Sequence, residues 1–255
     1  MNTAVGIDIG GTGIKGAVVD TASGELLTER FKLPTPPDSS PEFLLETVTE
    51  LFGLFGDVSP DTPVGIAFPS IIINGRTLSA YNVSTKWIGV EADALFEKTL
   101  GREIHFVNDA DAAGVAEAHF GAAKGQPGLV FLATLGTGIG TALLYNGHLI
   151  PNSELGHIEI NGVDAETVTS ARSRERAGLS IEEWAVRLQT YFERIELLLS
   201  PDLIVVGGGG SKAFEQFAPL LTLRTPLVPA TLRNNAGVMG AGYLAKNDHR
   251  PRQSS

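Results

Sequence analysis

The sequence predicts an α/β fold, and three observations support this prediction. Apolar strand-like segments alternate with amphipathic helical segments along the chain. A strand–turn–strand unit occurs twice, first at residues 5–19 and again at residues 129–145. Glycine-rich segments follow three of the apolar runs. Ligands of α/β proteins usually bind beyond the carboxyl ends of the strands, where these segments lie.

The composition excludes some kinds of site and argues against nucleic-acid-binding and membrane proteins. The chain has 255 residues, of which 43% are hydrophobic, and no cysteine, which excludes disulfides and thiolate metal sites. Its net charge of −10 argues against nucleic-acid binding, which depends on Lys and Arg. No stretch approaches the ~20 apolar residues of a membrane helix. No basic leader precedes the first strand, so we expect a cytoplasmic protein that binds neither nucleic acid nor membrane.

Hydrophobic spacing and end signals predict the individual elements. The predicted strands lie at residues 5–9, 14–19, 64–68, 104–107, 129–135, 141–145 and 201–206. The predicted helices lie at residues 41–55, 91–100, 109–116, 180–199 and 235–248. Pro41 suits a first helical position, and Ser180 with Glu183 forms a capping box.

The three glycine-rich segments are predicted to bind phosphate. Glycine lets backbone N–H groups approach an anion without a Cβ in the way. Neither the P-loop signature nor the Rossmann fingerprint is present, since the first two segments lead into strands. A single such segment would indicate a tight hairpin, but the repeat favours phosphate binding. The predicted phosphate-binding residues are Gly10, Gly11, Thr12, Gly13, Gly136, Thr137, Gly138, Gly207, Gly208 and Gly209.

Two charged residues flank the first glycine segment. Asp8 lies in an apolar strand, where a carboxylate is costly to bury unless it binds a cation or a donor. We therefore predict that Asp8 binds magnesium, directly or through water, with the ion bridging phosphoryl oxygens. The alternative is that Asp8 accepts hydrogen bonds from the loop. Lys15 is either a phosphate contact or a surface lysine.

Asn108 and Asp109 follow the strand at residues 104–107. Phosphoryl transfer needs a group that orients the acceptor hydroxyl and accepts its proton, and Asp109 is the predicted base. Asp also caps helices, a role that is compatible with catalysis.

Further polar residues are candidates for substrate binding. Glu154 and His157 offer paired acceptors for vicinal sugar hydroxyls, and Glu166 is a further acidic candidate. No tight histidine cluster surrounds His157, which argues against zinc. The basic run that comprises Arg172, Arg174 and Arg176 favours a solvated helix start over a polyanion path.

Taken in order, these motifs resemble the ROK family of bacterial sugar kinases over nearly the whole chain. Residues 8–15 and 134–140 resemble the family's two phosphate loops, and Asn108–Asp109 its catalytic pair. Residues 154–157 match its Glu-x-Gly-His sugar motif, and residues 204–209 its adenosine-side segment.

The resemblance implies a two-domain, actin-like fold of the ribonuclease H-like, hexokinase type, an ATPase fold with an interdomain cleft. We expect a small domain of residues 1–108, completed by the C-terminal helix 235–248. The large domain would comprise residues 109–234. Sugar would bind at the bottom of the cleft, and the donor would lie across the first two glycine segments. The residues expected to hold the sugar are Asn108, Asp109, Glu154, His157 and Glu166.

One departure from the family pattern narrows the expectation further. Typical members carry a cysteine-rich zinc loop after the Gly-His pair, ending in Cys-x-Glu, whereas residues 157–166 contain no cysteine. Zinc is therefore not expected, and Glu166 takes the place of a glutamate that binds sugar in the family. This segment, with residues 81–87, is similar to actinobacterial polyphosphate/ATP-dependent glucokinases of the glucomannokinase type. That resemblance implies Asn82 as a sugar contact and Lys86 as a donor contact.

The implied reaction is phosphorylation of glucose, with mannose as a second hexose, at O6 from inorganic polyphosphate or ATP. Three alternatives remain open from the sequence: an N-acyl amino-sugar kinase, a non-catalytic sugar-responsive regulator and an actin-like ATPase without a sugar acceptor. Regulators of the family carry a DNA-binding segment before the first phosphate loop, and because that loop begins at residue 10 we do not expect a regulator. The donor preference, the hexose preference and a homodimer are also left open.

Overall fold

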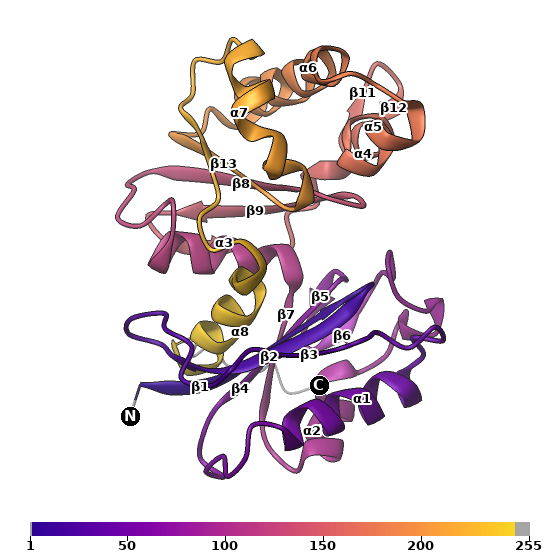
Figure 1. Cartoon of the computed structure of the whole chain (residues 1–255), viewed down its shortest axis with the longest axis vertical. Coiled ribbons are helices and arrows are strands. Elements are labelled where there is room, and N and C mark those ends of the chain that lie inside the picture. Colours follow the sequence, from indigo (N-terminus) through magenta and orange to yellow (C-terminus); the bar gives the residue numbers. More distant parts are fainter. Residues whose placement is uncertain (1, 248–255) are drawn as a thin grey trace. The chain divides into compact units, whose positions relative to one another are not determined.

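The computed structural model describes residues 2–247, which form two compact units (Figure 1). Among the described residues, unit 1 comprises residues 2–116 together with 235–247, and unit 2 comprises residues 117–234. The units therefore divide within the helix α3 (Asp109–Phe120), whereas the boundary predicted from the sequence lies after residue 108. Residue 248, the end of the predicted C-terminal helix, lies outside the described residues.

Unit 1 is built on a five-stranded mixed sheet. Its strands lie in the order β3 (Phe31–Leu33), β2 (Gly13–Asp20), β1 (Thr3–Gly10), β4 (Val64–Phe68) and β7 (Ile104–Asn108). The first three strands are antiparallel, while β1, β4 and β7 run parallel to one another. The carboxyl ends of β1, β4 and β7 therefore meet at one edge of the sheet.

Helices cover both faces of this sheet. The helices α1 (Pro41–Gly53) and α2 (Ala92–Leu100) share a core with the side chains of Ile7 and Ile66. The helix α8 (Ala236–Asn247) packs against the opposite side of β1 and β4. The remaining elements are the strand pair β5 (Ile72–Ile73) and β6 (Arg76–Thr77) and the 3₁₀ turn Thr85–Trp87.

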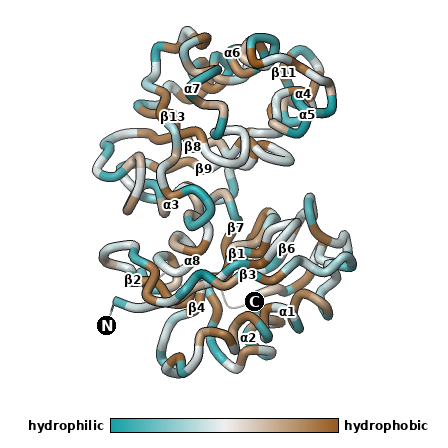
Figure 2. The backbone as a smooth tube through the Cα atoms, in the orientation of Figure 1, coloured by the Kyte–Doolittle hydropathy of each residue, from teal (hydrophilic) through white to brown (hydrophobic). Residues whose placement is uncertain are grey.

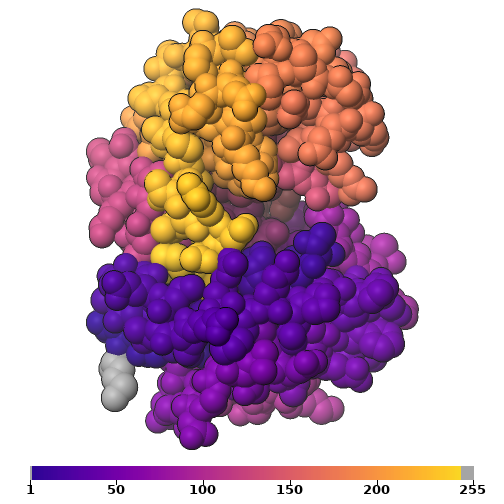
Figure 3. Space-filling view, in the orientation of Figure 1, coloured from indigo at the N-terminus to yellow at the C-terminus, as the bar shows by residue number. Residues whose placement is uncertain are grey.

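The close approach of α8 depends on two glycines that are register partners in β1 and β4. A Cβ atom at Gly6 would overlap the carbonyl oxygen of Val238, and one at Gly65 would overlap that of Ala241. Neither position can therefore hold a larger residue without moving the helix. The space-filling view shows the yellow C-terminal atoms directly against the indigo N-terminal ones (Figure 3).

Unit 2 repeats the sheet of unit 1. Its strands lie in the order β10 (His148–Ile150), β9 (Ile139–Tyr145), β8 (Leu129–Leu135), β13 (Leu203–Gly207) and β14 (Leu227–Pro229). Here too the first three strands are antiparallel, and β8, β13 and β14 are parallel. The structure thus confirms the repeat predicted from the sequence. The equivalence is close, since Asp8 pairs with Lys15 as Thr134 pairs with Gly140.

Short helices and one long helix complete unit 2. The helices are α4 (Ala165–Thr169), α5 (Ala171–Ala177), α6 (Ile181–Leu199) and α7 (Phe214–Phe217). The strands β11 (Glu159–Ile160) and β12 (Val163–Asp164) form a small pair, and the 3₁₀ turns lie at Leu155–His157, Gly209–Ala213, Ala218–Leu220 and Arg233–Asn235. Hydrophobic residues run along the central strands of both units, where β4 and β13 are buried throughout (Figure 2).

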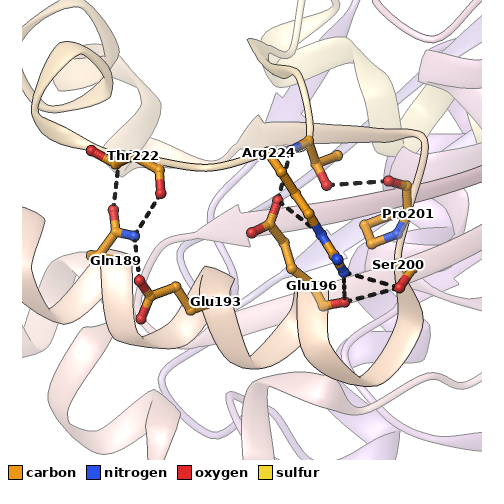
Figure 4. Close-up of polar contacts among 8 residues, drawn as sticks. Gln189, Glu193, Glu196, Ser200, Pro201, Thr222 and Arg224 are labelled. Atoms are coloured by element: carbon orange, nitrogen blue, oxygen red, sulfur yellow. Dashed lines mark hydrogen bonds and ion pairs between the residues drawn. The ribbon is translucent and has the colours of Figure 1, made fainter.

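The helix α6 begins at the predicted capping box and anchors the segment that leads into β14. The Ser180 side chain accepts a hydrogen bond from Glu183 N, and the Glu183 carboxylate accepts one from Ser180 N. The Gln189 side chain forms hydrogen bonds with both the N–H and the carbonyl oxygen of Thr222, and the Arg224 guanidinium donates to the Glu196 carbonyl oxygen in the last turn of the helix (Figure 4).

Among residues 2–247, none of the helices has the length and apolar character needed to span a membrane.

Candidate active site

The first glycine segment is the turn between β1 and β2 in unit 1. Gly10 and Gly13 form the last register pair of the two strands, so Gly11 and Thr12 make the turn. A Cβ atom at Gly11 would lie 3.2 Å from the Cβ atom and the carbonyl oxygen of Asn82. The Thr35 hydroxyl donates a hydrogen bond to the carbonyl oxygen of Gly10. Asn82, predicted as a sugar contact, therefore lies directly beside the first predicted phosphate loop.

Asn82 is held there by an anchored 3₁₀ turn. Trp87 is completely buried and stacks on Phe96 with its ring centroid 5.8 Å away. Its indole Nε1 donates to the carbonyl oxygen of Ser39 at 2.9 Å, and the Ser39 hydroxyl accepts from Ser84 N at 2.9 Å. The segment that follows Asn82 is thus fixed both by burial and by hydrogen bonds.

Asp8 and Lys15 form an ion pair at the base of the first turn. Their charged atoms lie 3.0 Å apart, and both side chains are mostly buried. A Cβ atom at Gly237, in the first turn of α8, would lie 2.8 Å from the Asp8 carboxyl carbon. Asp8 is therefore paired with a lysine rather than accepting hydrogen bonds from the turn. Lys86 lies at the exposed surface, with its Nζ atom 4.0 Å from a carboxylate oxygen of Asp38.

Asn108 and Asp109 lie at the junction of β7 and α3. The Asn108 side-chain oxygen accepts hydrogen bonds from the backbone N–H groups of Ala110 and Asp111, at 2.8 and 3.0 Å. Its amide nitrogen donates to the carbonyl oxygen of Ser70 at 3.0 Å. Asn108 therefore caps α3 and ties it to the end of β4. Asp109 is the first helical residue and is partly exposed, so its negative charge lies at the favourable end of the helix dipole.

The second glycine segment joins β8 and β9 in unit 2. Gly136 N donates to the carbonyl oxygen of Gly138 at 2.9 Å, and the Gly136 carbonyl accepts from Arg172 N at 3.1 Å. The Ile139 N–H donates to Glu166 Oε2 at 2.8 Å. Backbone and side-chain groups from α5 and α4 thus hold this turn. A Cβ atom at Gly138 would overlap the Glu166 carboxylate, which explains the glycine.

The third glycine segment lies against the start of the second. Gly208 has a φ angle of 75°, which side-chain-bearing residues rarely adopt, and a Cβ atom there would lie 2.7 Å from the Leu135 carbonyl oxygen. The carboxyl ends of β8 and β13 therefore bring two glycine segments together, as expected for neighbouring parallel strands.

Glu154, His157 and Glu166 form one electrostatic cluster in unit 2. Partial burial raises the pKa of Glu154, and the Glu166 charge raises it further, against the opposing effect of His157. Burial lowers the pKa of His157, but the hydrogen bond to Asp164 and the charges of Glu166, Asp164 and Glu154 bring a net increase. The His157 Nδ1 atom lies 2.9 Å from Asp164 Oδ2. An imidazole and two carboxylates therefore interact electrostatically within unit 2.

Asp164 is a functional candidate in addition to the residues predicted from the sequence. One of its oxygens accepts from Glu166 N at 2.9 Å, and the other bonds His157. Asp164 therefore orients both members of the cluster that flank it in the chain. The available signal was an Asp directly before a helical segment, a common capping position.

The predicted residues fall into two sets, one in each unit. Unit 1 holds Asp8, Gly10, Gly11, Thr12, Gly13, Lys15, Asn82, Lys86, Asn108 and Asp109. Unit 2 holds Gly136, Thr137, Gly138, Glu154, His157, Glu166, Gly207, Gly208 and Gly209. Of the two lysines in the unit 1 set, Lys15 is paired with Asp8, whereas Lys86 lies near the carboxylate of Asp38.

Two arginines of the basic run on α5 contact other parts of unit 2. Arg174 packs over the Trp184 ring at 5.5 Å, and Arg176 donates to the carbonyl oxygen of Thr167. Within residues 2–247, no group of three or more His, Asp or Glu side chains is arranged to hold a metal ion.

The chain is similar to known proteins over nearly its full length. The model of the ROK family matches residues 4–171. A polyphosphate glucokinase of Mycobacterium tuberculosis is 41% identical over 244 residues, which cover 95% of this chain and 91% of that protein. The crystal structure of an inorganic polyphosphate/ATP-glucomannokinase from Arthrobacter sp. strain KM is 49% identical, with a TM-score of 0.93 over 98% of this chain and 100% of the other.

A more distant structure shows the same fold. The ROK family glucokinase of Streptomyces griseus is 24% identical and matches with a TM-score of 0.78 over 96% of this chain and 99% of the other. Together with the two repeated sheets, these similarities show that the protein belongs to the ROK family and has its two-domain, actin-like α/β fold.

Proposed function

We propose that the protein is a hexokinase-type phosphotransferase, a polyphosphate/ATP-dependent glucokinase. It transfers the terminal phosphoryl group of inorganic polyphosphate or ATP to O6 of glucose, and mannose is a second acceptor. The observation that carries the proposal is the position of Asp109. Its carboxylate stands at the first position of a helix that Asn108 caps, in a chain 49% identical to a glucomannokinase.

The proposed chemistry is a single displacement at phosphorus. The O6 oxygen of glucose forms a bond to the terminal phosphorus, and the bond from that phosphorus to the bridging oxygen breaks. The proton of the O6 hydroxyl passes to Asp109, and the electron pair of the broken bond leaves with ADP or the shortened polyphosphate. A carboxylate suffices as the base because the proton is transferred late in such reactions.

The hexose would be bound through its other hydroxyl groups. Glu154, His157 and Glu166 supply acceptors and a donor from unit 2, and Asn82 supplies an amide from unit 1. Water must be excluded during transfer, because otherwise it would compete with the hexose for the phosphoryl group.

Asn108 would act here mainly by holding Asp109. Three hydrogen bonds already engage its amide, with Ala110, Asp111 and Ser70. One amide hydrogen remains for the predicted contact between Asn108 and the hexose. Its fixed orientation would keep the Asp109 carboxylate at one position relative to the end of β7.

Asp8 is the residue that would hold magnesium. Mg²⁺ commonly binds through one or two carboxylates and several waters together with substrate phosphates, so one carboxylate beside the first turn fits that ion. When bound, the ion would neutralise charge on the donor phosphates. Lys15 already neutralises part of the Asp8 charge, which favours contact between Asp8 and the ion through water.

The cytoplasmic location and a homodimer also remain predictions.

A coupled assay tests the proposed function. Glucose and mannose are each offered with ATP or polyphosphate in the presence of magnesium, and glucose 6-phosphate or mannose 6-phosphate is measured. We expect turnover of glucose with at least one donor, and a slower reaction with mannose. If neither hexose is phosphorylated with either donor, the proposed function is wrong.

A further inference from the structure

We propose that Lys32 binds the phosphate chain of the donor at the first glycine turn and contributes more to the use of polyphosphate than of ATP. This inference rests on the proposed function. It assigns a role to a residue of the edge strand β3, outside the motifs that identify the family.

Lys32 belongs to a row of three charged residues across the sheet of unit 1. Asp8 of β1 is the register partner of Lys15 of β2, and Lys15 is the register partner of Lys32 of β3. Register partners in antiparallel strands project from the same face. The row therefore carries one negative and two positive charges on a single face, next to the turn at Gly10–Gly13.

The Lys32 side chain extends over the turn itself. Gly13 lies two residues before Lys15 and so faces the same side of the sheet. A Cβ atom at Gly13 would lie 2.5 Å from Lys32 Cε and 3.4 Å from its Nζ. The absence of a side chain at position 13 thus leaves the space that the lysine stem occupies. This arrangement brings the ammonium group onto the predicted phosphate loop.

The charge of Lys32 is available for an anion. Lys15 is paired with Asp8, and Lys86 lies near Asp38. Lys32 forms no ion pair or side-chain hydrogen bond with any residue of the described part of the chain. Two lysines placed opposite each other repel, so an anion bound between them would relieve an unfavourable contact.

The binding of polyphosphate and the binding of ATP should depend on the charge of Lys32 to different extents. ATP can gain binding energy from its base and ribose, whereas polyphosphate offers only phosphate groups. The chain as a whole has a net charge of −10, which repels a polyanion unless local positive charge compensates. A lysine beside the loop should therefore matter most for polyphosphate.

Two substitutions of Lys32 separate its charge from its packing. Lys32→Met keeps an unbranched stem over Gly13 but removes the charge, and Lys32→Arg keeps the charge. We expect Lys32→Met to raise KM for polyphosphate about tenfold, the effect of losing one charge-assisted hydrogen bond. KM for ATP should rise less, and KM for glucose should stay within about twofold of the wild-type value. Lys32→Arg should restore most of the affinity for polyphosphate.

Lys98 provides a matched control, because it is an exposed lysine on α2 without an ion-pair partner in residues 2–247. Lys98→Met removes the same charge and should leave both donor KM values unchanged. Equal KM values for polyphosphate in Lys32→Met, Lys98→Met and the wild type would overturn the proposal. So would an equal rise in KM for both donors in Lys32→Met.

A binding measurement separates this inference from the proposed function. Magnesium tripolyphosphate is titrated into the wild type and Lys32→Met by calorimetry, without any hexose. Binding weakened about tenfold in the variant supports the role of Lys32, even if the wild type phosphorylates no sugar. Binding of equal strength, or no binding to the wild type, overturns it.

Discussion

Glu166 Oε2 accepts a hydrogen bond of 2.8 Å from the backbone N–H of Ile139, the first residue of β9. The same carboxylate contributes negative charge at Glu154 and His157. Glu166 therefore joins the second glycine turn to the candidate sugar-binding cluster within unit 2. A substitution at the glycine turn should consequently alter the sugar-binding cluster, and a substitution in the cluster should alter the turn.

Substitution of Glu166 tests this connection. Glu166→Gln keeps an oxygen that can accept from Ile139 but removes the charge, so the pKa of His157 should fall. Glu166→Ala also loses the hydrogen bond and should cost about 1–2 kcal/mol of unfolding free energy. NMR titration of His157 and urea denaturation measure the two effects. An unchanged pKa of His157 in Glu166→Gln would show that the two residues are not coupled.

The pair of His157 and Asp164 predicts a pH dependence of stability. The pKa of His157 is raised in the folded state, so the folded protein holds this proton more tightly than the unfolded chain does. Its stabilisation is present in full below the unfolded pKa of about 6.5 and is lost as pH rises through the higher folded value. The melting temperature should therefore fall as the pH rises from about 6.5 through the folded pKa of His157.

Asp164→Asn is the control for this pH effect. The variant removes the charge of the hydrogen-bond partner, so the pKa of His157 should fall and the decline in melting temperature above about pH 6.5 should become shallower. An identical pH profile in the wild type and Asp164→Asn would contradict the assignment.

The glycine contact between β4 and α8 should be essential for folding of unit 1. Gly65→Ala would place a methyl group on the Ala241 carbonyl oxygen, and we expect a loss of about 3 kcal/mol or more. Gly53→Ala, at the end of α1, meets no atom within 4 Å and should be neutral or stabilise by up to about 1 kcal/mol. Equilibrium denaturation distinguishes the two, and equal stability of both variants would refute this account of the packing.

Much of the fold followed from local sequence patterns. The two hairpins were predictable because the strings at residues 8–15 and 134–140 repeat both the glycines and the flanking apolar residues. Parallel strands then bring Gly136 and Gly208 to the same edge. This proximity depends only on strand direction and chain order, which the alternation of strands and helices predicts.

The side-chain partners could not be predicted in this way. Asp109 was a candidate cap of α3, yet the oxygen that accepts from both Ala110 N and Asp111 N belongs to Asn108. Asp109 Oδ1 accepts from one of these two donors, Ala110 N. Lys32 lies in a strand of three residues directly before a proline-rich stretch, and three residues are too few to predict a strand from their alternation. Its approach to Gly13 depends on the register of β3, which is a tertiary property.

The most direct test of the proposed mechanism is Asp109→Asn, which keeps the shape of the side chain but removes the base. We expect kcat for glucose phosphorylation to fall by at least about a hundredfold, the usual contribution of a positioned base. Glucose binding, measured by calorimetry, should stay within about threefold of the wild-type affinity, because other residues bind the hexose. A variant that keeps most of the wild-type kcat would contradict the assignment of Asp109 as the catalytic base.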